Sequence, residues 1–357
     1  MFGRRTLRAV SAVALSLTLA VPAGCTRARE SAPPPAADQG PAQELRLGYL
    51  PTITHAPALI GIQNGLFAGQ LGATRLATQT FNAGPAEVNA LLGSSLDVGF
   101  IGPGPAINAY KQNPEGIRLI AGATAGGAQL VVRPGITSPQ QLLGKTIATP
   151  QLANTQDIAL KTWLRDNDLP VGTGPEAVEV VNIENARALE AYRSGQLDGG
   201  WLPEPFASRF VLEAGATQLL DERTLWPGGQ FPTTVVIARI EYVQQHPATV
   251  AALLRGLVEA ERYAAGDPAS AKAAVNAGLW AAGSPPLAQR VLDRAWGQVT
   301  FGPDPLAATF PRLAQDAVTA GTASSPTPLR GLVEAGPLDT ALTAAGRSPV
   351  DTAGLGG

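Results

Sequence analysis

Apolar and polar positions alternate regularly along the chain between residues 45 and 240. Short runs of apolar and β-branched residues predict strands at 45–50, 75–81, 97–102, 117–124, 128–134, 145–150, 177–183, 197–203 and 233–239. Apolar residues at helical spacing predict helices between them at 55–67, 85–94, 104–112, 138–144, 155–167, 186–196 and 205–215. Strands that alternate with helices are typical of a mostly parallel sheet flanked by helices. The pattern therefore predicts an α/β protein.

The predicted elements form two α/β sets, followed by a helical C-terminal part. Helices are predicted there at 242–266, 268–282, 285–299 and 305–320. About 300 residues between the two ends are enough for two lobes with separate cores. We expect a discontinuous first lobe at 44–125 and 225–345, and a second lobe at 126–224. The glycine-rich connection near 124–128 is either a hinge between them or a plain turn.

The N-terminal residues 1–24 have the parts of a secretory signal. A basic start precedes an apolar run at 9–20, which is too short to span the ~30 Å of a bilayer core. Residues 25–43 are rich in proline, alanine and charge and are expected to form a flexible tether, and residues 346–357 a disordered tail. The chain is therefore expected to be exported.

Cys25 is the only cysteine of the chain. Ala23-Gly24-Cys25 is similar to a bacterial lipobox, which implies acylation of Cys25 and a lipid anchor at the outer face of the cytoplasmic membrane. Pro22 stands where leucine is usual in that motif, so ordinary cleavage after Ala23 is the alternative. In that case the protein would be periplasmic or secreted.

Composition excludes several classes of function. A net charge of −2 and a pI near 5.8 argue against nucleic acid as a partner. The two histidines, His55 and His246, are far apart and have no cysteine at zinc-ligand spacing, so no metal or cofactor is expected. Gly102-Pro103-Gly104 begins like a dinucleotide fingerprint, but Ile107 replaces the third glycine, and no G-x-S-x-G elbow is present. We therefore expect a protein that is not an enzyme.

Five polar loops follow predicted strands, at 51–55, 82–85, 102–105, 151–156 and 203–205. In open α/β sheets, ligands bind beyond the carboxyl ends of the strands, where helix N-termini present free N–H groups. Each loop alone could be a simple turn. Together they predict a ligand site.

The loops lie in segments that also carry a family resemblance, in this order: GYLPTITHAPALIGIQNGLF (48–67), FNAGPAEVNALLGSSLDVGFIGPGPAINAY (81–110), AGATAGGAQLVVRPGI (121–136), LLGKTIATPQLANTQDIALKTWL (142–164) and GGWLPEPFASRFVLEAGATQLLDERTLWPGGQFPTTVVI (199–237). They resemble the substrate-binding proteins of the aliphatic sulfonate, nitrate and taurine ABC importers. The resemblance implies a two-lobed periplasmic-binding-protein fold of type II that binds a small oxoanion or organosulfonate between its lobes. It also implies a monomer that delivers its ligand to a membrane permease.

The resemblance carries twelve residues into the predicted ligand site: Thr52, Thr54, His55, Asn82, Gly84, Gly102, Gly104, Gln151, Asn154, Thr155, Trp201 and Glu204. No lysine or arginine lies in these loops, so an anion would be held by backbone N–H groups, hydroxyls and amides.

Three of these residues have an alternative role. His55 either contacts the ligand or only starts a helix, and Trp201 is either a cleft wall or a core residue. Glu204 either pairs with an amine, which would favour a zwitterion such as taurine, or caps the helix after Pro205. The alternative ligand is a thiamine-precursor pyrimidine or similar heterocycle stacked on Trp201.

Overall fold

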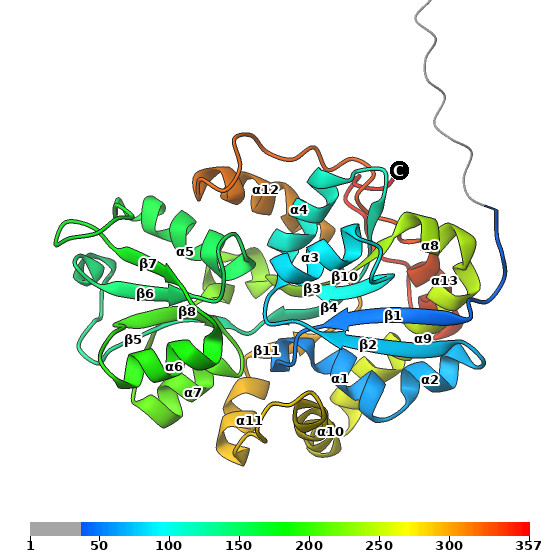
Figure 1. The fold of residues 1–357 in the computed structure, drawn as a ribbon, viewed down its shortest axis with the longest axis horizontal. Helices are drawn as coiled ribbons and strands as arrows, with labels where there is room; N and C mark the ends of the chain where they lie inside the picture. Colours follow the sequence, from blue (N-terminus) through cyan, green and yellow to red (C-terminus); the bar gives the residue numbers. More distant parts are fainter. Residues whose placement is uncertain (1–36) are drawn as a thin grey trace, which may run out of the picture. The chain divides into compact units, whose positions relative to one another are not determined.

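A computed structural model describes residues 37–357. The predicted signal segment, Cys25 and the predicted tether up to residue 36 lie outside the described residues. Figure 1 shows two β-sheets with helices on their faces. The predicted α/β fold with two sheets flanked by helices is therefore confirmed.

Sheet A has six strands in the order β11-β4-β10-β3-β1-β2. They are β1 (Glu44–Tyr49), β2 (Arg75–Thr80), β3 (Val98–Ile101), β4 (Ile117–Gly126), β10 (Pro232–Arg239) and β11 (Val299–Phe301). Sheet B has five, in the order β7-β6-β8-β5-β9. They are β5 (Ala128–Val132), β6 (Thr146–Thr149), β7 (Glu179–Asn182), β8 (Gly199–Pro203) and β9 (Thr217–Asp221). The strands of sheet A fall in the predicted first lobe and those of sheet B in the predicted second lobe, except that β4 extends one residue, Gly126, into the second. The exact lobe boundaries stay a prediction.

Both sheets are mixed, and not mostly parallel as predicted. Strand β1 pairs in parallel with β2 and β3, and β6 with β7 and β8. The strands that enter from the other sheet run the opposite way: β10 is antiparallel to β3 and β4, and β5 to β8 and β9. A helical crossover is what makes neighbouring strands parallel. Strands β5 and β10 arrive from the other sheet without a helical crossover, so they can run antiparallel to their neighbours.

Most predicted helices are present within a few residues of the expected bounds. They are α1 (Ala56–Gln63), α2 (Leu66–Leu71), α3 (Gly84–Leu92), α4 (Pro103–Gln112), α5 (Thr155–Asp166), α6 (Asn185–Arg193), α7 (Phe206–Ala214), α8 (Ile240–Gln245), α9 (Pro247–Gly266), α10 (Pro268–Ala281), α11 (Gln289–Trp296) and α12 (Phe310–Thr319). The helix predicted at 55–67 breaks into α1 and α2, because Gly65 adopts a left-handed conformation with φ 68°. Strands β9 and β11 and helix α13 (Gly336–Ala344) were not predicted. No helix of the described part is both long and apolar enough to cross a bilayer.

The C-terminal tail is attached to the fold, so the prediction of a disordered tail at 346–357 is wrong. The Gly331 and Val333 N–H groups both donate to Leu355 O, at 3.0 Å, and Val333 also forms a bridge with Leu119 of β4. The tail is held by backbone pairing with a distant segment. Such pairing leaves no apolar periodicity in the tail sequence from which its order could be predicted.

The two connections between the sheets lie side by side. Gly126 and Gly127, between β4 and β5, have φ angles of 73° and 79°, which favour glycine. The Gly126 N–H donates to Phe231 O at 2.8 Å, just before β10, and the Thr233 hydroxyl donates to Gly126 O. Both chain crossings therefore lie at one point, which is the geometry a hinge requires.

Candidate functional site

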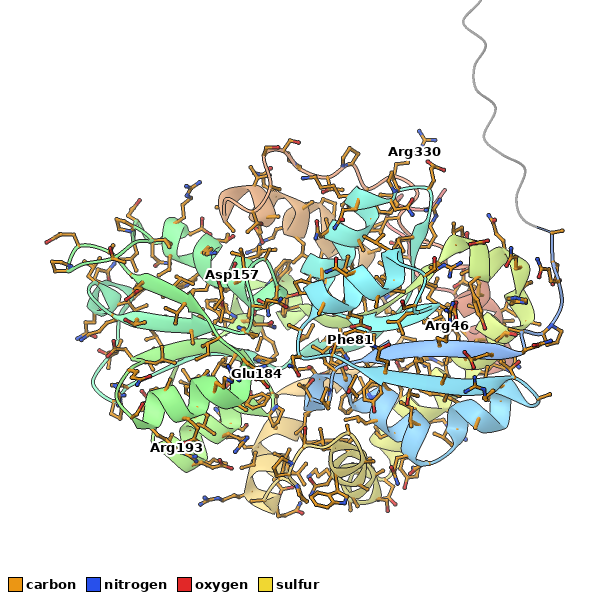
Figure 2. All side chains as sticks on the ribbon, in the orientation of Figure 1. Arg46, Phe81, Asp157, Glu184, Arg193 and Arg330 are labelled. Carbon is orange, nitrogen blue, oxygen red and sulfur yellow. The ribbon has the colours of Figure 1, made fainter. Side chains whose placement is uncertain are left out.

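A small pocket lies between loops that follow the strands of sheet A and loops that follow the strands of sheet B. In Figure 2, Phe81 after β2 and Glu184 after β7 both lie between the two sheets. Eight of the twelve predicted residues line this cleft pocket: Thr52, Thr54, His55, Asn82, Gly84, Gly102, Asn154 and Thr155. Its volume is about 30 Å³, which is room for about two water molecules. The pocket suits a ligand group of only a few atoms.

Four helices begin at the cleft pocket. Helices α3 and α4 start next to Ala83 and Gly102, and α5 and α6 start at Thr155 and Asn185. Each helix N-terminus has a partial positive charge of about half a unit. At α4 only this dipole is available, because Pro103 and Pro105 have no N–H group and the Gly104 N–H donates to Thr155 Oγ1. No lysine or arginine of the described residues lines the pocket. Positive potential there comes from backbone dipoles, which favour an anion.

His55 presents a neutral imidazole to the pocket. The ring is buried, with 2% exposure, and burial lowers its pKa to about 3. The Leu50 N–H donates to Nδ1 at 3.3 Å, which assigns the ring proton to Nε2. An Nε2–H group is a donor that an oxoanion can accept from.

Three polar pocket residues are not among the twelve predicted residues: Gln156, Asn185 and Thr233. Asn185 begins α6 after β7 and a short loop. A polar residue at a helix start after a strand is the pattern that predicted the other site loops, so it could have predicted Asn185 as well. Its buried Oδ1 has no hydrogen-bond partner in the described part of the chain. Thr233 follows the second chain crossing at the start of β10, where no local motif marks a ligand site.

The remaining four predicted residues do not line the pocket. Gly104 and Gln151 are close by: the Gly104 N–H donates to Thr155 Oγ1 at 3.3 Å, and Gln151 is next to the lining residue Pro150. Trp201 is fully buried in the core, and its Nε1–H donates to Glu222 Oε2 at 2.7 Å. The structure thus places Trp201 in the core role that was its alternative.

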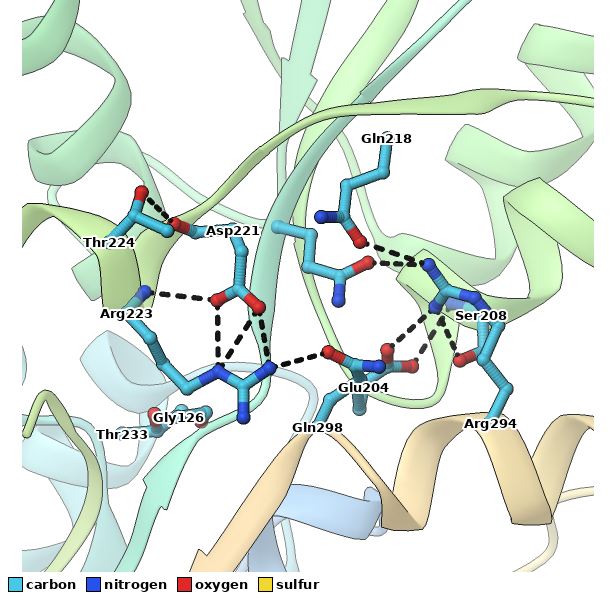
Figure 3. A network of polar contacts seen from close by, with 11 residues as sticks. Gly126, Glu204, Ser208, Gln218, Asp221, Arg223, Thr224, Thr233, Arg294 and Gln298 are labelled. Carbon is cyan, nitrogen blue, oxygen red and sulfur yellow. Dashed lines mark hydrogen bonds and ion pairs between the residues drawn. The ribbon is translucent and has the colours of Figure 1, made fainter. Parts of the chain in front are cut away.

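Glu204 is fully buried and has partners within the protein (Figure 3). Its Oε2 accepts the Ser208 N–H at 3.0 Å in the first turn of α7, and its Oε1 accepts from Arg294 Nη1 at 3.1 Å. Burial raises the pKa of this carboxyl to about 7, although the Ser208 and Arg294 contacts oppose the shift. The helix cap is therefore the role that the structure supports.

Arg294 connects α11 to sheet B and its helices. Its guanidinium also donates to Ser208 Oγ at 2.8 Å, to Gln129 Oε1 at 2.8 Å and to Gln218 Oε1 at 3.3 Å. On the opposite side of α11, Leu292 and Ala295 belong to the core that α1, α9 and sheet A share. We call Gln129, Glu204, Ser208, Gln218 and Arg294 the Arg294 network. It joins the part of the fold built on sheet A to sheet B.

A side chain at Gly102 should hinder contact between the two sides of the pocket. An added Cβ would lie 2.4 Å from Thr155 Oγ1, although the backbone at Gly102, with φ −70° and ψ 153°, suits any residue. We expect Gly102→Ala to weaken ligand binding roughly tenfold, as for a misfit of ~1.4 kcal/mol, and to leave folding intact. Calorimetric titration of Gly102→Ala, Thr155→Ala and the double variant checks this. If Gly102→Ala has the same effect in the Thr155→Ala background, the steric explanation fails.

Stability should peak at mildly acidic pH. Burial raises the pKa of Glu222 from its usual 4.5 to about 8. Between these two pH values the folded state holds a proton that the unfolded state releases, so stability falls as pH rises. His55 acts oppositely: stability falls as pH drops from 6.5 to about 3. Glu87, Glu204 and Glu261 also have pKa values that burial raises, so they act in the same direction as Glu222. We therefore expect the highest Tm at about pH 4–5. Glu222→Gln should flatten the alkaline side, and an unchanged slope would contradict this assignment.

The chain resembles several known proteins. The NMT1-like family profile matches residues 38–278. The taurine-binding periplasmic protein of Escherichia coli (strain K12) is 29% identical over 210 residues, 58% of this chain and 62% of that protein. The bicarbonate-binding protein CmpA of Synechococcus sp. is 25% identical over 246 residues, 61% of this chain and 53% of that protein. The matches thus span little more than half of these relatives.

A solved structure shows the same fold. It is the periplasmic aliphatic sulphonate binding protein SsuA from Escherichia coli, with a TM-score of 0.64 and 19% identity over 80% of this chain and 90% of that chain.

Proposed function

Because the chain belongs to the NMT1-like family, we propose that it is an exported solute-binding protein of an ABC importer. It captures a small oxoanion or organosulfonate in the cleft pocket and delivers it to a membrane permease. The observation that carries this proposal is the convergence of four helix N-termini and the neutral His55 donor on a pocket without a cationic side chain. The taurine, bicarbonate and sulphonate specificities of the relatives fit such a site.

The gross interaction energy of this site is of the order that a micromolar ligand requires. Helix N-termini contribute about 0.3–1 kcal/mol each, and hydrogen bonds to a charged group about 1.5–3 kcal/mol each. Together these approach the ~8 kcal/mol of a micromolar complex, before the costs of desolvation and closure are subtracted. A ligand group with several oxygens, such as a sulfonate, uses the most donors.

The second candidate ligand, a pyrimidine stacked on Trp201, has less support. The Trp201 ring is fully buried, packs against Trp163 with ring centroids 6.1 Å apart, and donates to Glu222. No face of this ring is available to a ligand without rearrangement of the core.

A ligand screen tests the proposal. The purified protein is titrated with taurine, ethanesulfonate, nitrate, bicarbonate and a hydroxymethylpyrimidine, with Tm and calorimetry as readouts. Stabilisation by at least one of the four anionic or zwitterionic compounds supports the proposal. Stabilisation by the pyrimidine alone, or turnover of any bound compound, would replace it. Size-exclusion chromatography tests the expected monomer.

The proposed lipid anchor depends on Cys25. We expect Cys25→Ser to move the protein from the membrane fraction to the soluble fraction, because a diacyl anchor holds a protein at a membrane and a free N-terminus does not. Immunoblots of fractionated cells measure this. If the wild-type protein is already soluble, Pro22 has prevented lipidation and the protein is simply exported.

A further inference from the structure

A second cavity, larger than the cleft pocket, lies between α5 and α12. Its volume is about 300 Å³, at the lower end of the range for small-molecule sites. One face of α5 forms a wall from Thr155 to Asn167, and Arg312, Leu313 and Asp316 of α12 form the opposite wall. Thr155 also lines the cleft pocket, so the two sites are neighbours. We call this site the α5–α12 cavity.

The lining of the α5–α12 cavity is rich in aromatic rings. Trp163, Trp226 and Phe231 all contribute, and the Trp226 and Phe231 ring centroids are 5.3 Å apart. The Arg312 guanidinium carbon lies 4.1 Å from the centroid of the Trp226 ring, so this ring already makes a cation–π contact within the protein. Aromatic faces attract cations through the quadrupole of the ring.

Carboxylates outnumber cations in the lining. Glu222, Asp166 and Asp316 face a single basic residue, Arg312. Arg312 is 3.8 Å from Asp316, and its Nη1 donates to Leu225 O rather than to an acid. The cavity therefore has an excess of negative charge whenever its acids are ionised.

Glu222 is the most unusual of these acids. It is 2% exposed, and its Oε2 accepts from Trp201 Nε1. Its Oε1 accepts no hydrogen bond from any residue that the structure describes. Oε1 is not one of the fully buried unpaired oxygens of the described residues, and Glu222 lines the cavity, so a ligand there can reach this oxygen. Burial raises the pKa of Glu222 to about 8 and that of Asp316 to about 6, which is the response of acids that lack a sufficient counter-charge.

We propose that the α5–α12 cavity binds a small organic cation, with an ammonium or amidinium group at Glu222 and Asp316 and an aromatic or apolar body against Trp163 and Phe231. The ligand class is opposite in charge to that of the cleft pocket. The cation would supply the missing donor to Glu222 Oε1, and the three rings would exclude water around it. The site is separate from the proposed transport function, because Thr155 is the only residue that its lining shares with the cleft pocket.

Benzamidine and benzamide provide a matched pair of probes, because they have almost the same shape and differ in charge. Calorimetric titration of the full chain at pH 7.5 is expected to show benzamidine binding at least tenfold more tightly than benzamide. Benzamidine affinity is expected to be unchanged in the presence of saturating taurine. Equal affinity for the two probes, or displacement by taurine, would overturn the proposal. Taurine binding in the same samples reports separately on the cleft pocket.

Two variants locate the site. Glu222→Gln keeps an acceptor for Trp201 but cannot ionise to pair with a bound cation, and it should weaken benzamidine binding tenfold or more. The control Glu213→Gln changes a carboxylate of α7 that pairs with Arg193 and Arg209 and is absent from the cavity lining, and it should have no effect. Ala159→Phe fills the cavity from α5 and should abolish binding, which keeps the test decisive if Glu222→Gln does not fold. Unchanged benzamidine affinity in Ala159→Phe would refute this location.

Discussion

Replacement of His55 by phenylalanine is expected to weaken binding of the best anionic ligand by roughly 10- to 100-fold, because a hydrogen bond to a charged group contributes about 1.5–3 kcal/mol. The imidazole is buried, neutral and protonated on Nε2, and it lines the cleft pocket. Phenylalanine has a similar shape but no donor. Isothermal titration with taurine or ethanesulfonate, whichever the wild type binds more tightly, measures the effect.

The chain contains one other histidine, which is a matched control. His246 lies outside the cleft pocket, with Nδ1 2.8 Å from Gly40 O and its ring against Tyr242. His246→Phe should keep the wild-type affinity within about twofold, or ~0.4 kcal/mol. Equal losses in the two variants would mean that His55 acts through stability and does not contact the ligand. Because the ring of His55 is already neutral at pH 7, its titration should add no pH dependence to the affinity between pH 6 and 8.

Removal of Arg294 should destabilise the protein more than any surface substitution. Arg294→Ala leaves Glu204 buried without its counter-charge, and breaking a buried ion pair costs about 3–5 kcal/mol. It also leaves Gln129, Ser208 and Gln218 without their bonds to the guanidinium. Urea unfolding followed by circular dichroism measures the loss. Arg209→Ala, which breaks a partly exposed i,i+4 pair with Glu213, should cost less than about 1 kcal/mol.

A double variant separates charge from packing in the Arg294 network. Arg294→Met with Glu204→Gln removes both charges and keeps most of the volume, so it should recover much of the stability lost in Arg294→Ala. A double variant as unstable as Arg294→Ala would show that the pairing is not the cause. Because Glu204 already has a cation from the protein, Glu204→Gln should change the affinities for taurine and ethanesulfonate by the same factor. A selective loss of taurine would instead restore the amine-binding role for Glu204.

The local pattern of the sequence determined most of the secondary structure and the loops of the site. Strand and helix periodicity depends on which face of an element is buried, and that information is local. The polar loops after β1, β2, β3 and β6 contribute eight expected residues to the cleft pocket. Strands joined by helices run parallel, so the carboxyl ends of β1, β2 and β3 share one edge of sheet A, and those of β6 and β8 share one edge of sheet B. The family resemblance rested on these same segments.

The tertiary structure decided which polar residues are available to a ligand. Glu204 lies in a polar loop after a predicted strand, as Thr52 and Asn154 do, yet its partner is Arg294, 90 residues away. Trp201 lies in the predicted strand before that loop, and its partner is Glu222, 21 residues away. The order of the C-terminal tail and the α5–α12 cavity likewise depend on contacts between distant segments. Local sequence determines where a polar side chain occurs along the chain, but a buried polar group must find a partner in space. Whether that partner is a ligand or another residue of the chain is set only when the fold brings them together.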